Sequence, residues 1–490
     1  MTRDASPPDA SPDPGADPGA GPEADTTHAR PQGGGDALPA ALLEWYRARL
    51  AELVALPSVA ADGRAIPETA AAVRDLLIGE GFDAELHATG GAPVVFAERR
   101  VPGAPTLLLY NHYDVQPEDP VDAWTSPPFE LTERDGAWYG RGAADDKGEI
   151  VSRLAALRAY RERHGDLPFG VVMVIEGEEE IGSPNLAAYV AAHADALAAD
   201  GCLWEFGGVD AAGTPVTYCG MKGVVTLDLR VRTAERDLHS SYGVVARGAA
   251  ARLAAAVASL EDEDGRVAVP GFTDGVRPPT DAQRALVDRL PDEAAELADV
   301  FGIPAWQRGL AGAAWNHALY FEPTLNVNGV HAGYGGEGAK TVLPSEAFAK
   351  LDVRLVPDQD PEAVVAAIRA HLDARGFADV EIVRGPHAER AGRSDPTDPF
   401  VLDAVAALED AYAVAPLVLP NSPGSGPIHP FVEGVGVPVV GIGCGYPGSR
   451  IHGPDEHVRI EDVRRGTLAT LRLFERVAAR AGVTPGRPTD

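Results

Sequence analysis

GVVMVIEGEEEIGS, at residues 170–183, begins with six consecutive apolar residues and ends in a cluster of carboxylates. An unbroken apolar run of this length is typical of a strand that is covered on both faces of a sheet. Residues 106–110 (TLLLY) form a second such run, and the polar segment Asn111–Asp114 follows it directly. In open α/β sheets, ligands gather beyond the carboxyl ends of the strands. We therefore expect an α/β domain whose functional site lies at that edge.

The pattern changes along the chain and predicts two domains, in keeping with a length of 490 residues. Apolar strands alternate with amphipathic helices over residues 37–217, and this pattern returns over 390–482. Between them, Val225, Leu227 and Leu229 alternate with polar residues, as do Leu351 and Val353, which indicates a sheet with one solvated face. We expect a catalytic domain with a mixed sheet flanked by helices, interrupted by an inserted α+β domain at residues 218–389.

The terminal segments and the overall charge restrict the class of protein further. Residues 1–36 are rich in Pro, Gly and Asp and are expected to be a disordered tail, and 483–490 a flexible C-terminus. A formal charge of −31 argues against nucleic-acid and anionic-membrane partners. Three widely spaced cysteines suggest reduced thiols, and the sequence shows neither a signal peptide nor a membrane span. These features favour a cytoplasmic protein.

Five short polar segments carry the candidate chemistry. Taken singly, each could be an acidic turn, a solvated charge run or a surface loop. Taken together, they supply two imidazoles and several carboxylates, and closely packed carboxylates repel one another unless protons or cations neutralise them. A site for two divalent cations is therefore the leading hypothesis. The segments are Asn111–Asp114, Gly142–Gly148, Glu178–Ser183, Trp204–Phe206 and Ile451–Glu456.

In this order and at this spacing, the segments resemble those of the M20 family of metallopeptidases, above all its branch of cytosolic nonspecific dipeptidases and carnosinases. The resemblance extends over about residues 40–480. It includes the segments Asp237–Ser240 and Lys340–Pro344 in the inserted domain. It implies that the inserted domain acts as a lid and as the dimerisation surface of a homodimer.

The resemblance also implies roles for individual residues. His112, Asp145 and Glu205 would bind one metal ion, and Asp145, Glu180 and His452 a second, so that Asp145 bridges the two. Glu179 would be the general base and Asp114 would orient His112. In the inserted domain, His239 would stabilise the oxyanion from a partner subunit. The substrate contacts would be Thr341, Arg354, His387 and Ser425, with Arg354 gripping a C-terminal carboxylate, although Arg354 is equally compatible with a position on a solvated sheet face.

The implied reaction is hydrolysis of dipeptides or short peptides by a hydroxide that bridges two metal ions, Zn²⁺ first and Mn²⁺ or Co²⁺ as alternatives. One position departs from the dipeptidase branch, which usually has Asp where this chain has Glu205. Three alternatives stay open. They are an N-acyl-amino-acid deacylase, a carboxypeptidase for longer peptides, and a binding protein that holds metal without catalysis.

Overall fold

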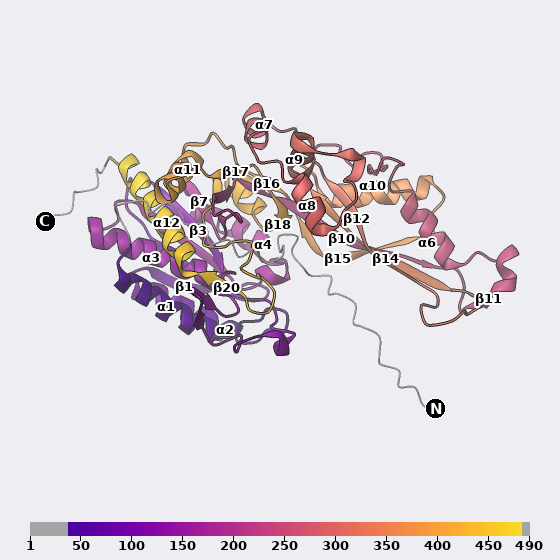
Figure 1. Cartoon of the computed structure of the whole chain (residues 1–490), viewed down its shortest axis with the longest axis horizontal. Coiled ribbons are helices and arrows are strands. Elements are labelled where there is room, and N and C mark those ends of the chain that lie inside the picture. Colours follow the sequence, from indigo (N-terminus) through magenta and orange to yellow (C-terminus); the bar gives the residue numbers. More distant parts are fainter. Residues whose placement is uncertain (1–37, 483–490) are drawn as a thin grey trace.

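The computed structural model describes residues 38–482. The predicted tail at 1–36 and the C-terminus at 483–490 lie outside the described residues. A six-stranded sheet forms the centre of the first domain, in the order β1-β2-β6-β3-β7-β19 (Figure 1). Strands β3, β6, β7 and β19 run parallel, whereas β1 and β2 are antiparallel neighbours at one edge, so the sheet is mixed as predicted. Their bounds are β1 Asp83–His87, β2 Val94–Arg99, β3 Thr106–His112, β6 Gly170–Glu176, β7 Gly201–Trp204 and β19 Val439–Gly441.

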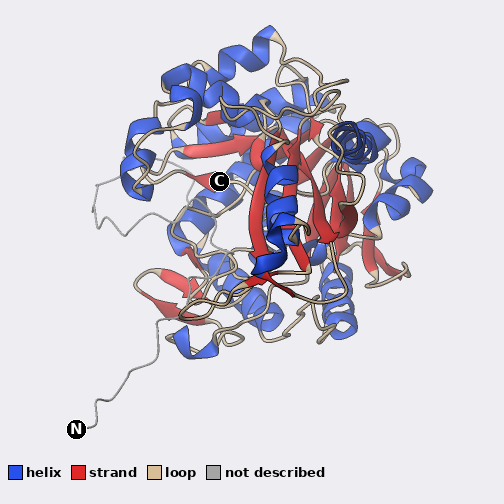
Figure 2. Ribbon diagram, turned by 90° about the vertical axis from the view of Figure 1, so that its right-hand side faces the viewer, coloured by secondary structure: helices blue, strands red, loops and turns tan. Residues whose placement is uncertain are grey.

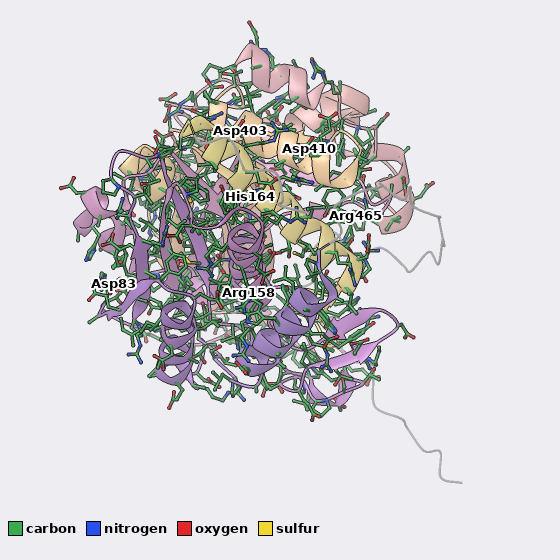
Figure 3. The ribbon with its side chains drawn as sticks, turned by 90° about the vertical axis from the view of Figure 1, so that its left-hand side faces the viewer. Asp83, Arg158, His164, Asp403, Asp410 and Arg465 are labelled. Atoms are coloured by element: carbon green, nitrogen blue, oxygen red, sulfur yellow. The ribbon has the colours of Figure 1, made fainter. Side chains whose placement is uncertain are left out.

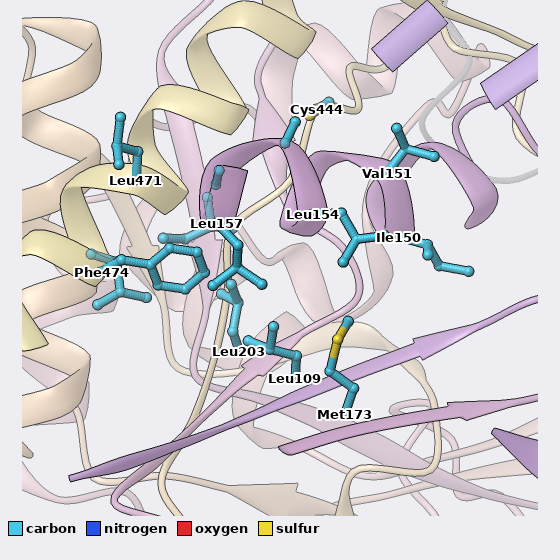
Figure 4. Packing of buried hydrophobic residues seen from close by; sticks show 14 of the residues in the cluster. Leu109, Ile150, Val151, Leu154, Leu157, Met173, Leu203, Cys444, Leu471 and Phe474 are labelled. Atoms are coloured by element: carbon cyan, nitrogen blue, oxygen red, sulfur yellow. The ribbon is translucent and has the colours of Figure 1, made fainter. Parts of the chain in front are cut away.

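Helices cover both faces of this sheet, which explains the unbroken apolar runs. On one face, α3 (Lys147–His164) lays Leu154 and Leu157 over Leu109 and Met173 of the strands (Figure 4). The helices α1 (Ala40–Val54), α2 (Ile66–Gly79), α11 (Pro399–Tyr412) and α12 (Ile460–Arg480) share that core. The opposite face packs against α4 (Leu186–Ala192), α5 (Ala194–Leu197) and η5 (Pro430–Val435).

The outward sides of these helices are polar and are joined by ion pairs. His164 of α3 lies 2.8 Å from Glu475 of α12, and Arg158 lies 2.9 Å from Glu80 (Figure 3). Within residues 38–482, none of the helices combines the length and the apolarity that crossing a bilayer requires. The three cysteines are buried and unpaired.

A second, antiparallel sheet has the order β12-β14-β10-β15, and helices lie against it (Figure 2). Its strands are β12 Thr324–Ala332, β14 Glu346–Leu355, β10 Gly220–Arg232 and β15 Glu381–Glu389. One face packs on α6 (Ala249–Ala258) and α10 (Pro361–Ala374) in a separate core built from residues between Val225 and Val380, and the other face of β10 and β14 carries mainly polar side chains together with the exposed Phe348. This agrees with the predicted period-two alternation. The boundaries at 218 and 389 stay predictions.

Strand β10 belongs to both halves of the molecule. Its first residues pair with β16 (Gly392–Arg393) and β18 (Ser422–Ser425), and its remaining length pairs with β14 and β15. The second sheet is thereby attached to the first domain by continuous backbone hydrogen bonding. Shorter elements complete the two halves: η1 Val121–Ala123, η2 Glu179–Ile181, η3 Ser240–Val244, η4 Gln307–Gly309, α7 Asp281–Val287, α8 Ala294–Phe301, α9 Gly312–Phe321, β4 Thr132–Arg134, β5 Ala137–Tyr139, β8 Gly208–Val209, β9 Pro215–Tyr218, β11 Leu238–His239, β13 Val342–Leu343, β17 Leu417–Leu419 and β20 His457–Arg459.

Candidate metal centre

Five side chains from distant parts of the chain meet beyond the carboxyl ends of the parallel strands. His112 is the last residue of β3, Glu180 lies in η2 just after β6, and Glu205 directly follows β7. Asp145 lies in the loop before α3, and His452 in the segment before β20. Because parallel strands end at the same edge of a sheet, their loops bring these residues together.

The carboxylate of Asp145 lies between the two imidazoles. Its Oδ1 is 3.0 Å from Nε2 of His112, and its Oδ2 is 3.1 Å from Nε2 of His452. Nε2 of His452 is also 3.1 Å from Oε2 of Glu180, and Nε2 of His112 is 3.9 Å from Oε2 of Glu205. The two oxygens of one carboxylate thus face two separate sets of nitrogen and oxygen donors.

Two groups of side chains have the spacing of metal ligands. In one group, donor atoms of Asp145, Glu180 and His452 all lie within 4.8 Å of one another, as they do for His112, Asp146 and Glu205 in the other. Asp146 was not among the residues predicted from the sequence. Its Oδ2 accepts hydrogen bonds from the Asn111 amide (2.7 Å) and from the backbone N–H of His112 (3.0 Å), so it also holds the end of β3.

The buried donors fit a cation. Oε2 of Glu205 and Oδ1 of Asp146 are buried, and neither has a hydrogen-bond partner among residues 38–482. An unpartnered buried carboxylate oxygen is costly unless a cation or proton satisfies it. Nitrogen and oxygen donors without thiolate suit Zn²⁺, Mn²⁺ or Co²⁺.

The electrostatics of the site show an excess of negative charge. Burial and the neighbouring carboxylates raise the pKa of Glu180 and of Glu205 above the usual range. Burial alone would lower the pKa of His452, but its contacts with Asp145 and Glu180 raise it to about 11. The pKa of His112 is likewise raised, against the effect of burial, by Asp114 and Asp145. Raised pKa values of this kind indicate negative charge that bound cations would neutralise.

Asp114 lies between His112 and the acidic loop that carries Glu179 and Glu180. The Asp114 carboxylate accepts the backbone N–H groups of Glu179 (3.3 Å) and Glu180 (3.0 Å). Nδ1 of His112 is 3.1 Å from the Asp114 carbonyl oxygen and 3.4 Å from its Oδ1. Asp114 therefore contacts both the imidazole and the acidic loop. The Glu179 carboxylate itself makes no hydrogen bond or ion pair within the described part of the chain, and burial raises its pKa well above the usual range.

Three of the predicted substrate contacts lie together beside the acidic loop at residues 178–183. Nη1 of Arg354 donates to Oγ of Ser425 at 2.9 Å. His387 lies against Gly182, so closely that a Cβ there would be 2.6 Å from its Nδ1. Glu389 shares this corner and was missed by sequence reasoning, because only the pairing of β15 with β10 brings it there. Burial raises the pKa of Glu389 to about 7, although Arg354 opposes the shift.

His239 and Thr341 are not brought to the site within one chain. His239 ends β11 and Thr341 directly precedes β13, and both are exposed; next to them, the backbone N–H of Ser240 donates to the Thr341 carbonyl at 2.9 Å. Figure 1 shows β11 at the end of the second domain that is remote from β3 and β20. A role for His239 in catalysis thus requires a second copy of the chain, and this stays a prediction.

The chain is similar in sequence to several proteins whose names state an activity. The chain is 30% identical to the Beta-Ala-His dipeptidase of Rattus norvegicus over 58% of this chain, a match that spans only 58% of the rat protein. It is 30% identical to the cysteinylglycine-S-conjugate dipeptidase of Corynebacterium striatum, over 80% of this chain and 86% of that protein. Among solved structures, the M20 family metallo-carboxypeptidase Sso-CP2 from Sulfolobus solfataricus matches with a TM-score of 0.83 and 36% identity, over 89% of this chain and 99% of that one.

The family model covers most of the described chain. The model of Peptidase family M20/M25/M40 matches residues 108–476, from the middle of β3 to the last turns of α12. This range includes every member of the two ligand groups and the inserted sheet. The resemblance found in the sequence is confirmed, and the chain belongs to peptidase family M20/M25/M40.

Proposed function

We propose that this protein is a dinuclear metallopeptidase that hydrolyses dipeptides and other short peptides with a free C-terminal carboxylate. The observation that carries the proposal is the placement of Asp145, whose two oxygens face His112 at 3.0 Å and His452 at 3.1 Å. The dipeptidase names of the relatives in rat and Corynebacterium striatum support the choice of substrate.

The ligand sets would be those predicted from the sequence. His112, Asp145 and Glu205 would hold one ion, and Asp145, Glu180 and His452 the other, with Asp146 close enough to His112 to take part. Bound divalent ions would polarise the scissile carbonyl and lower the pKa of the attacking water. Zinc is the proposed ion on affinity, and Mn²⁺ or Co²⁺ fit the same donors.

The remaining steps fall to side chains that bind no metal. The Glu179 carboxylate is free of hydrogen bonds within residues 38–482 and can take the proton of the attacking water and pass it to the leaving amine. Asp114 fixes the loop that carries this carboxylate. Arg354, 2.9 Å from Ser425, would bind the C-terminal carboxylate of the substrate, a role suited to its planar guanidinium. His239 would come from the partner in a homodimer formed through the inserted domain and would stabilise the oxyanion.

A carboxypeptidase acting on longer peptides is the second candidate. The match with Sso-CP2, at 36% identity over 89% of this chain, favours it. Glu205, which stands where the dipeptidase branch usually has Asp, points the same way. Both reactions release a C-terminal amino acid. They differ in whether the substrate can have more than one residue on the amino side of the cleaved bond.

The test is hydrolysis of three matched substrates by metal-stripped protein, with Zn²⁺ or Mn²⁺ added back. The substrates are a dipeptide, the tripeptide that extends it at the amino end, and the N-acetyl derivative of its first residue. Metal-dependent cleavage of the dipeptide alone supports a dipeptidase, and equal cleavage of the tripeptide supports the carboxypeptidase. Cleavage of only the acetylated compound would overturn both and assign a deacylase.

A further inference from the structure

Arg141 and Glu456 form a buried ion pair beside the candidate metal centre, and neither is among the site residues predicted from the sequence. Arg141 lies in the loop after β5 and Glu456 immediately before β20, 315 positions apart. Nη1 of Arg141 is 2.8 Å from Oε2 of Glu456, and both side chains are 1% exposed. Such a pair is weak evidence for stability by itself, because desolvation offsets much of the attraction. The remaining contacts of both side chains indicate what the pair does.

The Glu456 carboxylate holds the loop that ends in the bridging residue. Its Oε2 accepts the backbone N–H of Gly142 at 3.1 Å in addition to Arg141. Its Oε1 accepts the backbone N–H groups of Ala144 (3.0 Å) and Asp145 (3.1 Å). One carboxylate thus fixes three backbone amides of the segment that presents Asp145 to both imidazoles.

The second nitrogen of the guanidinium binds two other loops of the site. Nη2 of Arg141 donates to the carbonyl oxygens of Pro117 and of His452, each at 3.0 Å. Pro117 follows Gln116, whose amide donates to Oε2 of Glu180 at 2.9 Å. The pair therefore connects three segments, and each segment holds or contacts a proposed ligand.

The backbone of His452 needs such support. Its φ is 66°, in the left-handed region that non-glycine residues rarely adopt, and Arg450 and Asp455 in the same segment also have positive φ. A conformation of this kind persists only where surrounding contacts hold it. The hydrogen bond from Arg141 to the His452 carbonyl is one such contact, at the ligand residue itself.

We propose that Arg141 and Glu456 are positioning residues of the metal centre: Glu456 fixes Asp145 and Arg141 fixes His452, so that the site accepts two cations. The inference rests on the proposed dinuclear function. A purely structural ion pair would stabilise the fold as a whole, whereas Glu456 and Arg141 hold the backbone of different ligands. Replacing Arg141 should therefore weaken one of the two metal-binding steps, and replacing Glu456 should weaken both.

The test compares three variants by calorimetric titration of the metal-stripped protein with Zn²⁺. His452→Ala identifies the binding step that depends on His452. In Arg141→Lys, the ammonium can keep Glu456 but cannot reach both carbonyls, and that same step should weaken by about 10–100-fold, the usual effect of removing a contact that orients a ligand. The other step should stay close to that of wild type. Glu456→Gln places an amide where N–H donors converge and should weaken both steps, because Asp145 serves both.

Arg134→Lys is the matched control. Arg134 lies in β4 and donates to Oδ1 of Asp455 at 3.1 Å. Asp455 precedes Glu456 in the sequence, and Arg134 contacts none of the proposed ligand residues within residues 38–482. Both binding steps should stay unchanged in this variant. The melting temperature of each metal-free variant is measured in parallel, so that loss of folding is separated from loss of positioning.

Wild-type affinity of both steps in Arg141→Lys would overturn the inference while leaving the dinuclear function intact. Equal weakening of both steps together with a lower melting temperature of the metal-free protein would assign the pair a structural role and overturn it as well. If Arg141→Lys does not fold, Glu456→Gln decides: weakening of both steps at an unchanged melting temperature of the metal-free protein supports the inference, whereas wild-type affinity of both steps, or weakening together with a lower melting temperature, overturns it. Binding of fewer than two ions by the wild-type protein would instead refute the proposed function, and is visible before any variant is made.

Discussion

Replacing Glu179 by Gln is expected to abolish most of the hydrolysis without removing metal. The change keeps the shape of the side chain and removes only its capacity to accept a proton. Glu180, the next residue, faces His452 at 3.1 Å, whereas the Glu179 carboxylate contacts no hydrogen-bonding group of the described chain. Loss of the Glu179 charge should therefore leave both ligand groups in place.

The magnitude follows from the role of a general base. Proton transfer by a positioned carboxylate contributes about 10²–10⁴-fold to the rate. At about 1.4 kcal/mol for each factor of ten, this raises the barrier by about 3–5 kcal/mol. Since the residue is not proposed to bind substrate, the change should appear in kcat, with KM nearly constant.

The assay measures kcat and KM for one dipeptide together with metal content by mass spectrometry. Glu180→Gln is the contrasting variant and should lose bound metal as well as activity. Retention of more than about a tenth of the wild-type kcat by Glu179→Gln would refute the assignment of the general base. Loss of metal from Glu179→Gln would show that Glu179 is a ligand.

Four further outcomes are expected. Asp145→Asn should reduce the bound metal to less than one ion per chain, because its oxygens face both imidazoles, and metal analysis after dialysis checks this. Arg354→Met should raise KM by about 10–100-fold for dipeptides with a free C-terminal carboxylate but not for their C-terminal amides, as paired Michaelis–Menten measurements would show. Leu154→Ala, fully buried in α3, should lower the free energy of unfolding by about 2–5 kcal/mol, against less than about 0.5 kcal/mol for the exposed Leu402→Ala, measured by urea denaturation. Burial lowers the pKa of Lys222 from 10.5 to about 8, so between these pH values the unfolded chain binds more protons than the folded chain and the free energy of unfolding rises with pH. From about pH 7.5 to about pH 10, the free energy of unfolding of wild type should therefore rise relative to that of Lys222→Met. An unchanged difference between the two proteins would contradict this expectation.

The convergence of the candidate ligands at one edge of the sheet could be predicted because each signal is local. His112, Glu180 and Glu205 each end or follow an apolar strand, and the carboxyl ends of parallel strands meet at one edge of the sheet. The period-two alternation at Val225–Leu229 and at Leu351–Val353 likewise predicted the two faces of β10 and β14. Local periodicity was enough for these elements.

The groups that hold the ligands in place could not be predicted in the same way. Arg141 meets Glu456, 315 positions away, and Glu389 reaches the substrate corner only through the register of β15 on β10. No pattern in a single segment indicates such pairs, since they depend on tertiary structure. Asp146 was passed over for a different reason. Asp145 and Asp146 are adjacent carboxylates in one loop, and the sequence does not distinguish them. Only the folded structure shows that Asp146 lies close to the imidazole of His112 and accepts its backbone N–H.

Under the proposed function, peptide hydrolysis requires two cations bound around Asp145. The most direct test is to titrate metal-stripped protein with Zn²⁺, and to measure bound metal and dipeptide cleavage in the same samples. We predict that binding saturates at two ions per chain and that cleavage rises with the second. Full cleavage by the stripped protein, or saturation of cleavage while the second ion is still unbound, would contradict the account.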